Sequence, residues 1–327
     1  MFLDSARPAR STAGETQLSV GILGTGWVGT SVAISVLQSG FASDLLLADA
    51  RTEVAEGEAM DLSHGAAFYP TASVRAVAVD ELVTTDALVI AAGKGGKPGQ
   101  SRLELLRENA GILRRIGVGL RNYRGLVVVV TNPVDVLTYV VAESSGLPAE
   151  RVIGTGTMLD TARLRQAIGR ELDIAAQSVH AHVIGEHGDS EVVLWSTAHV
   201  GGLPLRRWPG WHPEREAPLA EEVRRAAYEI IRRKGATNHA IGLVTAALLR
   251  ASLRGERRVQ TVSRVQDGTL GIRDVALSLP TVVDAGGAVA VVSPELSPDE
   301  HSALEHSAAV LRQALRSLDT VAATSSQ

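Results

Sequence analysis

The sequence has no cysteine among its 327 residues, which excludes several kinds of chemistry. A disulfide, a thiolate metal site and a cysteine nucleophile are all impossible. The absence fits a cytoplasmic protein. No stretch is long and apolar enough to cross a bilayer, so we expect no membrane partner. The formal net charge is only −4, and nucleic acid is therefore not expected as a partner.

The composition is that of a globular protein with a large core, since 45% of the residues are hydrophobic and 21% are charged. The length suggests two domains. Residues 1–17 lack an apolar core of signal-peptide length, and we predict a flexible tail there. We place the first domain at 18–152, the second at 153–320 and a C-terminal tail at 321–327.

The first domain alternates short apolar runs with segments of helical spacing. The runs are Leu18–Leu23, Leu45–Ala48, Ala87–Ala92 and Leu126–Val130, and helices are expected at Trp27–Leu37 and Leu103–Leu120. Continuous apolar runs are typical of parallel strands that are buried on both faces. The pattern predicts an α/β fold with a doubly wound parallel sheet, the Rossmann arrangement.

The second domain is mixed α+β. We expect a helix at Asp160–Leu172, one or two helices within Leu219–Arg250, and a helix that begins at Ser297-Pro298. Strands are expected at Val179–Ile184, Val192–Trp195, Ile272–Leu277 and Ala288–Val292. Pro204–Pro218 is predicted to be an exposed irregular loop that carries Trp208 and Trp211.

A Gly-x-Gly-x-x-Gly motif follows the first strand and opens a helix. It consists of Gly24, Gly26 and Gly29, with Trp27 and Val28 between the last two. The glycines permit a tight turn, backbone approach to a pyrophosphate and close helix–strand packing. Asp49 ends the next strand, where a carboxylate binds ribose hydroxyls and repels a 2′-phosphate, so we predict NAD as the cofactor. A glycine turn without a nucleotide is the alternative.

His187 lies where a predicted strand runs into a loop, in Ile184-Gly-Glu-His-Gly-Asp189. Histidine exchanges its proton near neutral pH, and a strand end presents such a group rigidly. A structural histidine is the alternative, as is a zinc cluster of His187 with His180 and His182. No metal-ligand spacing supports the cluster, and we predict no metal.

Two arginine-bearing segments precede His187. Asp160 and Arg163 share neighbouring helix faces, so Asp160 can orient His187 while Arg163 binds a carboxylate; a surface salt bridge is the alternative. The segment from Lys94 to Arg102 is glycine-rich and follows a buried strand, which is typical of a mobile lid, although an ordinary loop has the same composition. A proton donor, a nicotinamide site and two guanidinium groups are the parts needed to reduce a 2-oxo acid.

From about Leu18 to Leu318, the chain resembles the L-lactate/malate dehydrogenase family, and most of all its bacterial lactate dehydrogenases. The motifs that carry the resemblance are Gly-Thr-Gly-Trp-Val-Gly29, Met-Asp-Leu-Ser-His-Gly65, Lys-Pro-Gly-Gln-Ser-Arg102, Thr-Asn-Pro-Val-Asp135, Gly-Thr-Gly-Thr-Met-Leu-Asp-Thr-Ala-Arg163, Ile-Gly-Glu-His-Gly-Asp189 and Lys-Gly-Ala-Thr237.

The resemblance implies an NAD-dependent L-2-hydroxyacid dehydrogenase and a role for each matching residue. It makes His187 the acid-base group with Asp160 as its partner, and Arg163 the ligand of the substrate carboxylate. Arg102 would polarise the reacting carbonyl. Asn132 would lie beside the nicotinamide ribose and the substrate, and Thr237 would line the pocket.

One position departs from the family pattern. The lid residue that reads the substrate side chain is usually glutamine in lactate enzymes and arginine in malate enzymes, but here it is Gly96. A glycine cannot pair with a second carboxylate unless Lys94 or Lys97 substitutes, and it leaves room for a 2-oxo acid bulkier than pyruvate. The alternatives are a malate dehydrogenase and a non-catalytic NAD-binding redox sensor.

The resemblance also implies regulation and assembly. Arg165 and His180 match positions that bind fructose 1,6-bisphosphate at a subunit interface in allosteric bacterial lactate dehydrogenases. Paired across a two-fold axis, they would form a four-cation pocket for two phosphates. A homo-oligomer, a tetramer or a dimer, is therefore expected. The alternative is that both are simply interface or surface residues that bind no effector.

Overall fold

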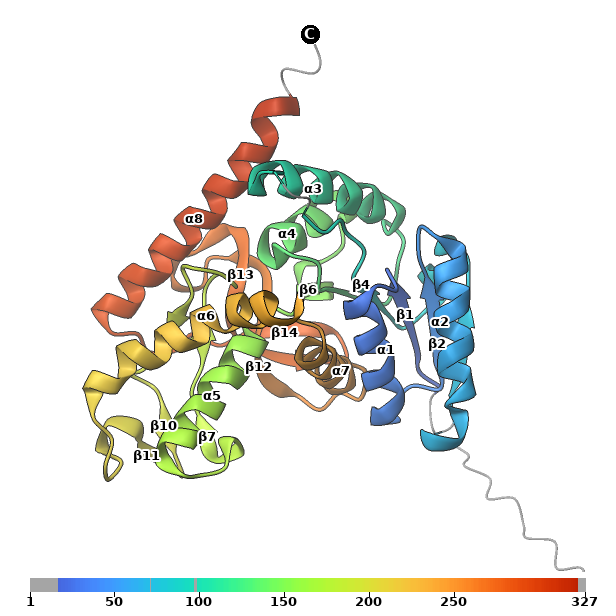
Figure 1. Cartoon of the computed structure of the whole chain (residues 1–327). Coiled ribbons are helices and arrows are strands. Elements are labelled where there is room, and N and C mark those ends of the chain that lie inside the picture. The colour runs from blue at the N-terminus through green and yellow to red at the C-terminus, as the bar shows by residue number, and fades with distance from the viewer. Residues whose placement is uncertain (1–16, 71, 97–98, 323–327) are drawn as a thin grey trace, which may run out of the picture.

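The computed structural model of the chain describes residues 17–70, 72–96 and 99–322 (Figure 1). Residues 1–16 of the predicted N-terminal tail therefore lie outside the described residues. Residues 323–327 of the predicted C-terminal tail also lie outside them. Residues 321 and 322 belong to the last helix, α8 (Pro298–Ala322). Within the described part of the chain, no helix has the length and apolarity to cross a membrane.

Six parallel strands form the first half of the main sheet, in the order β3-β2-β1-β4-β5-β6. They are β1 (Ser19–Leu23), β2 (Asp44–Ala48), β3 (Ser73–Ala76), β4 (Ala87–Ile90), β5 (Leu126–Val129) and β6 (Val152–Gly154). Their helices are α1 (Trp27–Ser39), α2 (Thr52–His64), α3 (Arg102–Gly119) and α4 (Val134–Ser145). The predicted doubly wound sheet is confirmed, and β1 and β4 flank the point where the strand order reverses.

The apolar runs form these strands because both faces of the sheet are covered. Every residue of β4 and β5 is buried. On one face, the core is completed by side chains of α3, α4 and α8, among them Leu113, Leu137 and Leu304. On the other face, α1 and α7 (His239–Leu253) contribute Val32, Val36 and other buried side chains. A strand buried on both sides has no polar alternation, as the sequence shows.

Three antiparallel strands from the second half extend the same sheet to nine strands. They are β12 (Arg258–Asp267), β13 (Arg273–Asp284) and β14 (Gly287–Val291). Ser263 of β12 pairs with Gly154 of β6, which joins the halves through the backbone. The expected strands at 272–277 and 288–292 are parts of β13 and β14, whereas β12 was not predicted. The two predicted domains therefore share one sheet.

The other elements of the second half cluster beyond this sheet (Figure 1). The helices α5 (Met158–Leu172) and α6 (Glu216–Lys234) are accompanied by short strands. These are β7 (Val179–His180), β8 (Val183–Ile184), β9 (Val192–Val193), β10 (His199–Val200) and β11 (Leu203–Pro204). The expected single strand at 179–184 is divided, because β7 pairs with β10 and β8 pairs with β9 in separate sheets.

The structure decides one open expectation in the second half and corrects another. The helical region at 219–250 is two helices, since Gly235 ends α6 in the left-handed conformation with φ +89°. Trp211 is not exposed: it is 5% accessible and packs on Trp195 with ring centroids 6.0 Å apart. The segment around Trp211 is mostly polar in sequence, but the indole is part of a buried hydrophobic cluster formed by elements that are distant along the chain.

The glycine turn between β1 and α1 gives a prediction about stability, in which Gly26 serves as the control for Gly29. A Cβ on Gly29 would overlap the Gly24 carbonyl oxygen, whereas a Cβ on Gly26 would meet no atom within 4 Å. We expect Gly29→Ala to lower the free energy of unfolding by about 1–3 kcal/mol, the usual cost of overpacking. Gly26→Ala should cost less than about 1 kcal/mol. Equal losses in chemical denaturation would contradict this account of the turn.

Candidate active site

The segment that carries His187 is anchored from two sides. Thr157 Oγ1, at the start of α5, donates to the carbonyl oxygen of Val183 in β8 at 2.6 Å, and the Val183 N–H donates to Thr161 Oγ1 at 3.0 Å. One residue after β8, Gly185 exchanges two backbone hydrogen bonds of 2.9 Å with Ser278 of β13. These bonds fix the loop that follows β8 against both α5 and the sheet.

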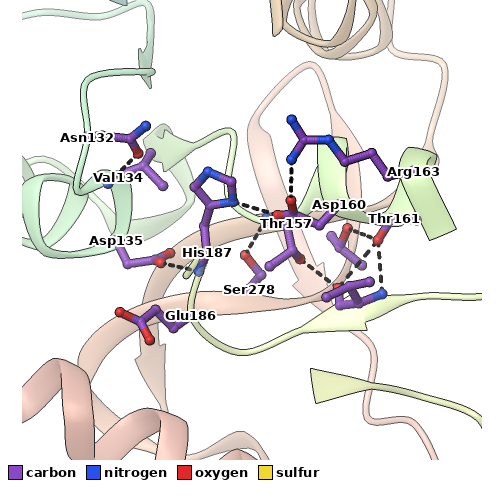
Figure 2. Close-up of polar contacts among 12 residues, drawn as sticks. Asn132, Val134, Asp135, Thr157, Asp160, Thr161, Arg163, Glu186, His187 and Ser278 are labelled. Carbon is purple, nitrogen blue, oxygen red and sulfur yellow. Dashed lines mark hydrogen bonds and ion pairs between the residues drawn. The ribbon is translucent and has the colours of Figure 1, made fainter. Parts of the chain in front are cut away.

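Asp160 joins the two cationic groups of the site (Figure 2). His187 Nδ1 lies 2.5 Å from Asp160 Oδ2, and Arg163 donates to Asp160 Oδ1 at 2.9 Å. The side chains of Asp160 and Arg163 are 3% and 15% exposed, so their pair is not the surface salt bridge that was considered as an alternative. Each carboxylate oxygen has one cationic partner, which leaves Nε2 of His187 on the side of the ring away from Asp160.

The buried pair of Asp160 and His187 shifts the pKa of both groups. Burial by itself disfavours the imidazolium, but the charge and hydrogen bond of Asp160 outweigh it and raise the pKa of His187 to about 9. Burial likewise opposes ionisation of Asp160, yet His187 and Arg163 hold the pKa of this carboxyl below its usual value. The free protein at pH 7 thus carries a protonated His187 that is ready to donate.

Glu191 is a buried acid near this pair that the sequence analysis did not single out. Burial, and then the charge of Asp160, raise the pKa of Glu191 to about 8, so the group is neutral at pH 7. Its Oε1 has no hydrogen-bond partner among the described residues. The only sequence signal was its position four residues after His187, which does not reveal burial.

The site opens into a cavity of about 470 Å³ between the two halves of the chain. Its lining brings together Arg102, Asn132, Asp160, Arg163 and His187. Arg102 is the first residue of α3, whose start is fixed by a capping box between Ser101 and Glu104. The structure therefore places five of the predicted site residues around one space, although they come from four different elements.

Two predicted substrate residues lie outside that lining. Thr237 is half-buried in the link between α6 and α7, and Gly96 is exposed on the predicted lid. A Cβ on Gly96 would meet only Leu105 Cδ2, at 3.5 Å, and Leu105 does line the cavity. Lys97 and Pro98 of the lid lie outside the described residues. Gly96 is thus near the edge of the cavity.

The glycine turn lies at the carboxyl end of β1, next to the end of β2. Gly24 has φ +97°, a conformation that favours glycine, and Gly26 is the N-cap of α1. Asp49 Oδ2 accepts the Thr25 N–H at 2.9 Å, so the carboxylate lies beside the turn. Trp27 is 63% exposed and lines a different cavity, toward α6 and α7, while Val28 packs against the core.

These features fit a bound dinucleotide. The open space at Gly26 and the free N–H groups at the start of a helix suit a pyrophosphate. The Asp49 carboxylate suits a ribose diol. When bound, the nicotinamide ring supplies or accepts a hydride; the residues around the cavity can hold a substrate and move a proton. In the described ranges 17–70, 72–96 and 99–322, no group of three or more His, Asp or Glu side chains could hold a metal.

Arg165 and His180 lie near each other on the second half. Arg165 Nε donates to the Ala181 carbonyl oxygen at 3.0 Å, beside the exposed His180. Burial, Arg165 and His180 together lower the pKa of the neighbouring His182 to about 4. The three basic side chains therefore share one small region, away from the cavity that contains His187.

A Rossmann half and a second α/β half, with His187 beside a cavity at their junction, form the arrangement of a dinucleotide-dependent oxidoreductase. Comparison with known proteins agrees. The lactate/malate dehydrogenase NAD-binding domain matches residues 18–154, and the alpha/beta C-terminal domain of the same family matches 157–321. The chain belongs to the lactate/malate dehydrogenase family, and NAD is its cofactor.

Curated relatives include the L-lactate dehydrogenase of Salinibacter ruber, 46% identical over 301 residues, with 90% of this chain and 95% of the relative covered. That of Bacillus caldolyticus is 43% identical at the same coverage. The solved minor L-lactate dehydrogenase of Enterococcus mundtii has a TM-score of 0.90 and 39% identity, covering 92% of this chain and 98% of its own. The chain is thus an L-lactate dehydrogenase-like NAD-dependent oxidoreductase that acts on a 2-hydroxy acid.

Proposed function

We propose that the protein interconverts pyruvate, or a bulkier 2-oxo acid, and the matching L-2-hydroxy acid, and that the residues around Asp160 do the chemistry. The observation that carries this is the single buried carboxylate that binds both His187 and Arg163 beside one cavity. Arg163 is placed to bind the substrate carboxylate. His187 Nε2 donates the proton to the substrate oxygen, and Asp160 stabilises the imidazolium.

Two residues from the first half would complete the reaction site. Arg102 would stabilise the negative charge that develops on the substrate oxygen, and Asn132 would lie between the nicotinamide ribose and the substrate. Thr237 would line the substrate pocket. Gly24, Gly26, Val28 and Gly29 would hold the dinucleotide through the backbone, together with Trp27. Asp49 would bind the adenosine ribose and disfavour NADP.

The cations near the cavity that could bind a second substrate carboxylate already have acidic partners, which counts against malate. Lys94 Nζ is 3.2 Å from Glu108 Oε2, so its charge already has a partner. Arg224, which also lines the cavity, is 2.6 Å from Glu221 Oε2. The cavity wall includes Leu105, which lies near Gly96, and also Ala227 and Ile231, and these apolar surfaces suit an alkyl or aryl side chain.

The catalytic assignment is tested by His187→Ala and Arg163→Ala. Each should lower the rate of 2-oxo acid reduction by roughly 100- to 10,000-fold, the usual contribution of an acid-base or charge-stabilising group. The Kd for NADH should stay within about threefold, because neither residue belongs to the dinucleotide turn. His212→Ala, which removes an exposed histidine of the same half, is the control. A loss of NADH affinity as large as the loss of rate would refute these roles, and a wild-type protein without turnover would favour the redox sensor.

The open position at Gly96 predicts broad acceptance of substrates. Branched or aromatic 2-oxo acids should be used at a kcat/KM within about a hundredfold of pyruvate, since apolar contacts discriminate only that far. Gly96→Gln should shift preference toward pyruvate, and Gly96→Arg toward oxaloacetate. The measurement is kcat/KM over a panel of 2-oxo acids for the three proteins. Strict pyruvate specificity in the wild type would show that this glycine does not widen the site.

Arg165 and His180 support an effector pocket in a cytoplasmic homo-oligomer. Paired across a two-fold axis, the two side chains would present four cations to the two phosphates of fructose 1,6-bisphosphate. The hydrogen bond from Arg165 to Ala181 fixes one guanidinium beside His180. Binding at such an interface would favour one quaternary state and tighten substrate binding by linkage.

Substrate saturation with and without the bisphosphate tests the pocket. The bisphosphate should lower the half-saturating substrate concentration by about fivefold or more. The effect should be larger at pH 6 than at pH 7.5, because histidine gains charge over this range. His180→Gln should reduce the response without changing activity in the absence of bisphosphate. Superimposable curves at both pH values would mean that the pair binds no effector.

A further inference from the structure

Asp135 is a buried acid that touches the backbone of His187, and the reaction described above gives it no role. It is the second residue of α4 and is 2% exposed. Its Oδ2 accepts the backbone N–H of His187 at 2.7 Å. Figure 2 shows Asp135 on one side of His187 and Asp160 on the other. The histidine is therefore held by one carboxylate at its ring and by a second at its backbone.

Among the described residues, His187 is the cation whose charge acts on Asp135. Burial raises the pKa of Asp135 to about 6, while Ser263, the His187 N–H and the His187 charge act in the opposite direction. Ser263 faces the carboxyl group, but neither its Oγ nor Asp135 Oδ1 has a formed hydrogen bond among the described residues. Above pH 6 the carboxylate is a buried negative charge, and the protonated His187 is the cation that compensates it.

Asn132 lies just before α4. Its Oδ1 accepts the N–H of Val134, the first residue of the helix that carries Asp135, at 3.2 Å. Asn132 lines the cavity from the first half, and Asp135 holds the loop of His187, which belongs to the second half. The segment from Asn132 to Asp135 thus connects the lining of the cavity with the loop that carries His187.

We propose that Asp135 is a positioning residue for the proton transfer: its charge favours the imidazolium of His187, and its hydrogen bond fixes the backbone that carries the ring. This inference rests on the proposed acid-base role of His187. Loss of the charge should shift the proton equilibrium of His187, whereas loss of the hydrogen bond should also misplace the ring. The two effects can be separated, because an asparagine keeps the acceptor oxygen and removes the charge.

The other charged and titratable groups around His187 are the same residues in all of the variants. Asp160 and Arg163 face it from α5, Glu186, Asp189 and Glu191 lie on its own loop, and Arg102 and Arg224 line the same cavity from α3 and α6. Asp160 raises the pKa of His187 more than Asp135 does, and Arg163 lowers it. Since burial raises the pKa of Asp135 to about 6, its effect on His187 should vanish below that pH.

The variants are Asp135→Asn, Asp135→Ala and the control Glu143→Gln. Glu143 is exposed on the same helix, so its variant removes one negative charge from α4 at a distance from His187. In Asp135→Asn the new amide N–H group faces the unpaired Ser263 Oγ, which should help the variant to fold. Thermal melting of each variant establishes that the fold is retained before the other measurements.

The first readout is the pKa of the His187 ring in the free protein, which is measured by an NMR titration of labelled histidine. The wild-type and Glu143→Gln proteins should titrate near pH 9. Asp135→Asn should titrate at least about half a pH unit lower, since an opposite charge has been removed. An unchanged midpoint in folded Asp135→Asn would overturn the proposal. This readout does not depend on which substrate the enzyme uses, or on whether it turns one over.

The second readout is the pH profile of 2-oxo acid reduction by NADH. Because the protonated His187 is the donor, the rate falls as pH rises through its pKa, and Asp135→Asn should move this fall to lower pH. Near pH 7, kcat of Asp135→Asn should remain within about threefold of wild type, whereas Asp135→Ala should lose about tenfold or more. Superimposed profiles for wild type and Asp135→Asn would also refute the role. A shifted NMR midpoint without any turnover would instead refute the proposed function alone.

Discussion

The site depends on the ion pairs that the buried carboxylate of Asp160 makes with Arg163 and His187. An isolated charge in the interior is strongly unfavourable, but each oxygen of this carboxylate has its own cationic partner, Arg163 and His187. The pair holds the imidazole protonated at neutral pH and keeps the arginine near the same cavity. In the proposed reaction, this one side chain couples proton donation to carboxylate binding. Thr157 and Thr161 bond β8, and these bonds hold the segment of His187 against α5, which carries Asp160.

The continuous nine-stranded sheet explains why the site lies at the junction of the halves. The parallel strands of the first half bring the glycine turn and the start of α3 to their carboxyl edge. The antiparallel strands of the second half continue the sheet from β6, and the His187 loop is bonded to β13. Backbone hydrogen bonds cross this boundary, so the glycine turn and the His187 loop are held in fixed positions relative to each other. Asp135 of α4 adds one more link, because it accepts the backbone N–H of His187.

Much of the architecture could be predicted because it depends on local pattern. Continuous apolar runs predicted the parallel strands, and Gly24, Gly26 and Gly29 predicted the turn into α1. The spacing of Asp160 and Arg163 predicted that they share a helix face, and the structure shows them bonded. The expected exposure of Trp211 was wrong, and the strand at 179–184 proved to be two, because burial and pairing there depend on elements far along the chain. β12 was missed for the same reason.

The sequence by itself determined many of the elements and the dinucleotide turn, since periodicity and glycine placement act over a few residues, and it predicted which side chains react. The reading of the residues and the resemblance to a known family both predicted the pairing of Asp160 with His187. Only the tertiary structure decided which groups are buried together. Asp135 and Glu191 look like ordinary acidic residues in the sequence, but they are enclosed beside His187, where low solvation shifts their pKa values to about 6 and about 8. Desolvation depends on every element packed around a group, and no local pattern encodes it.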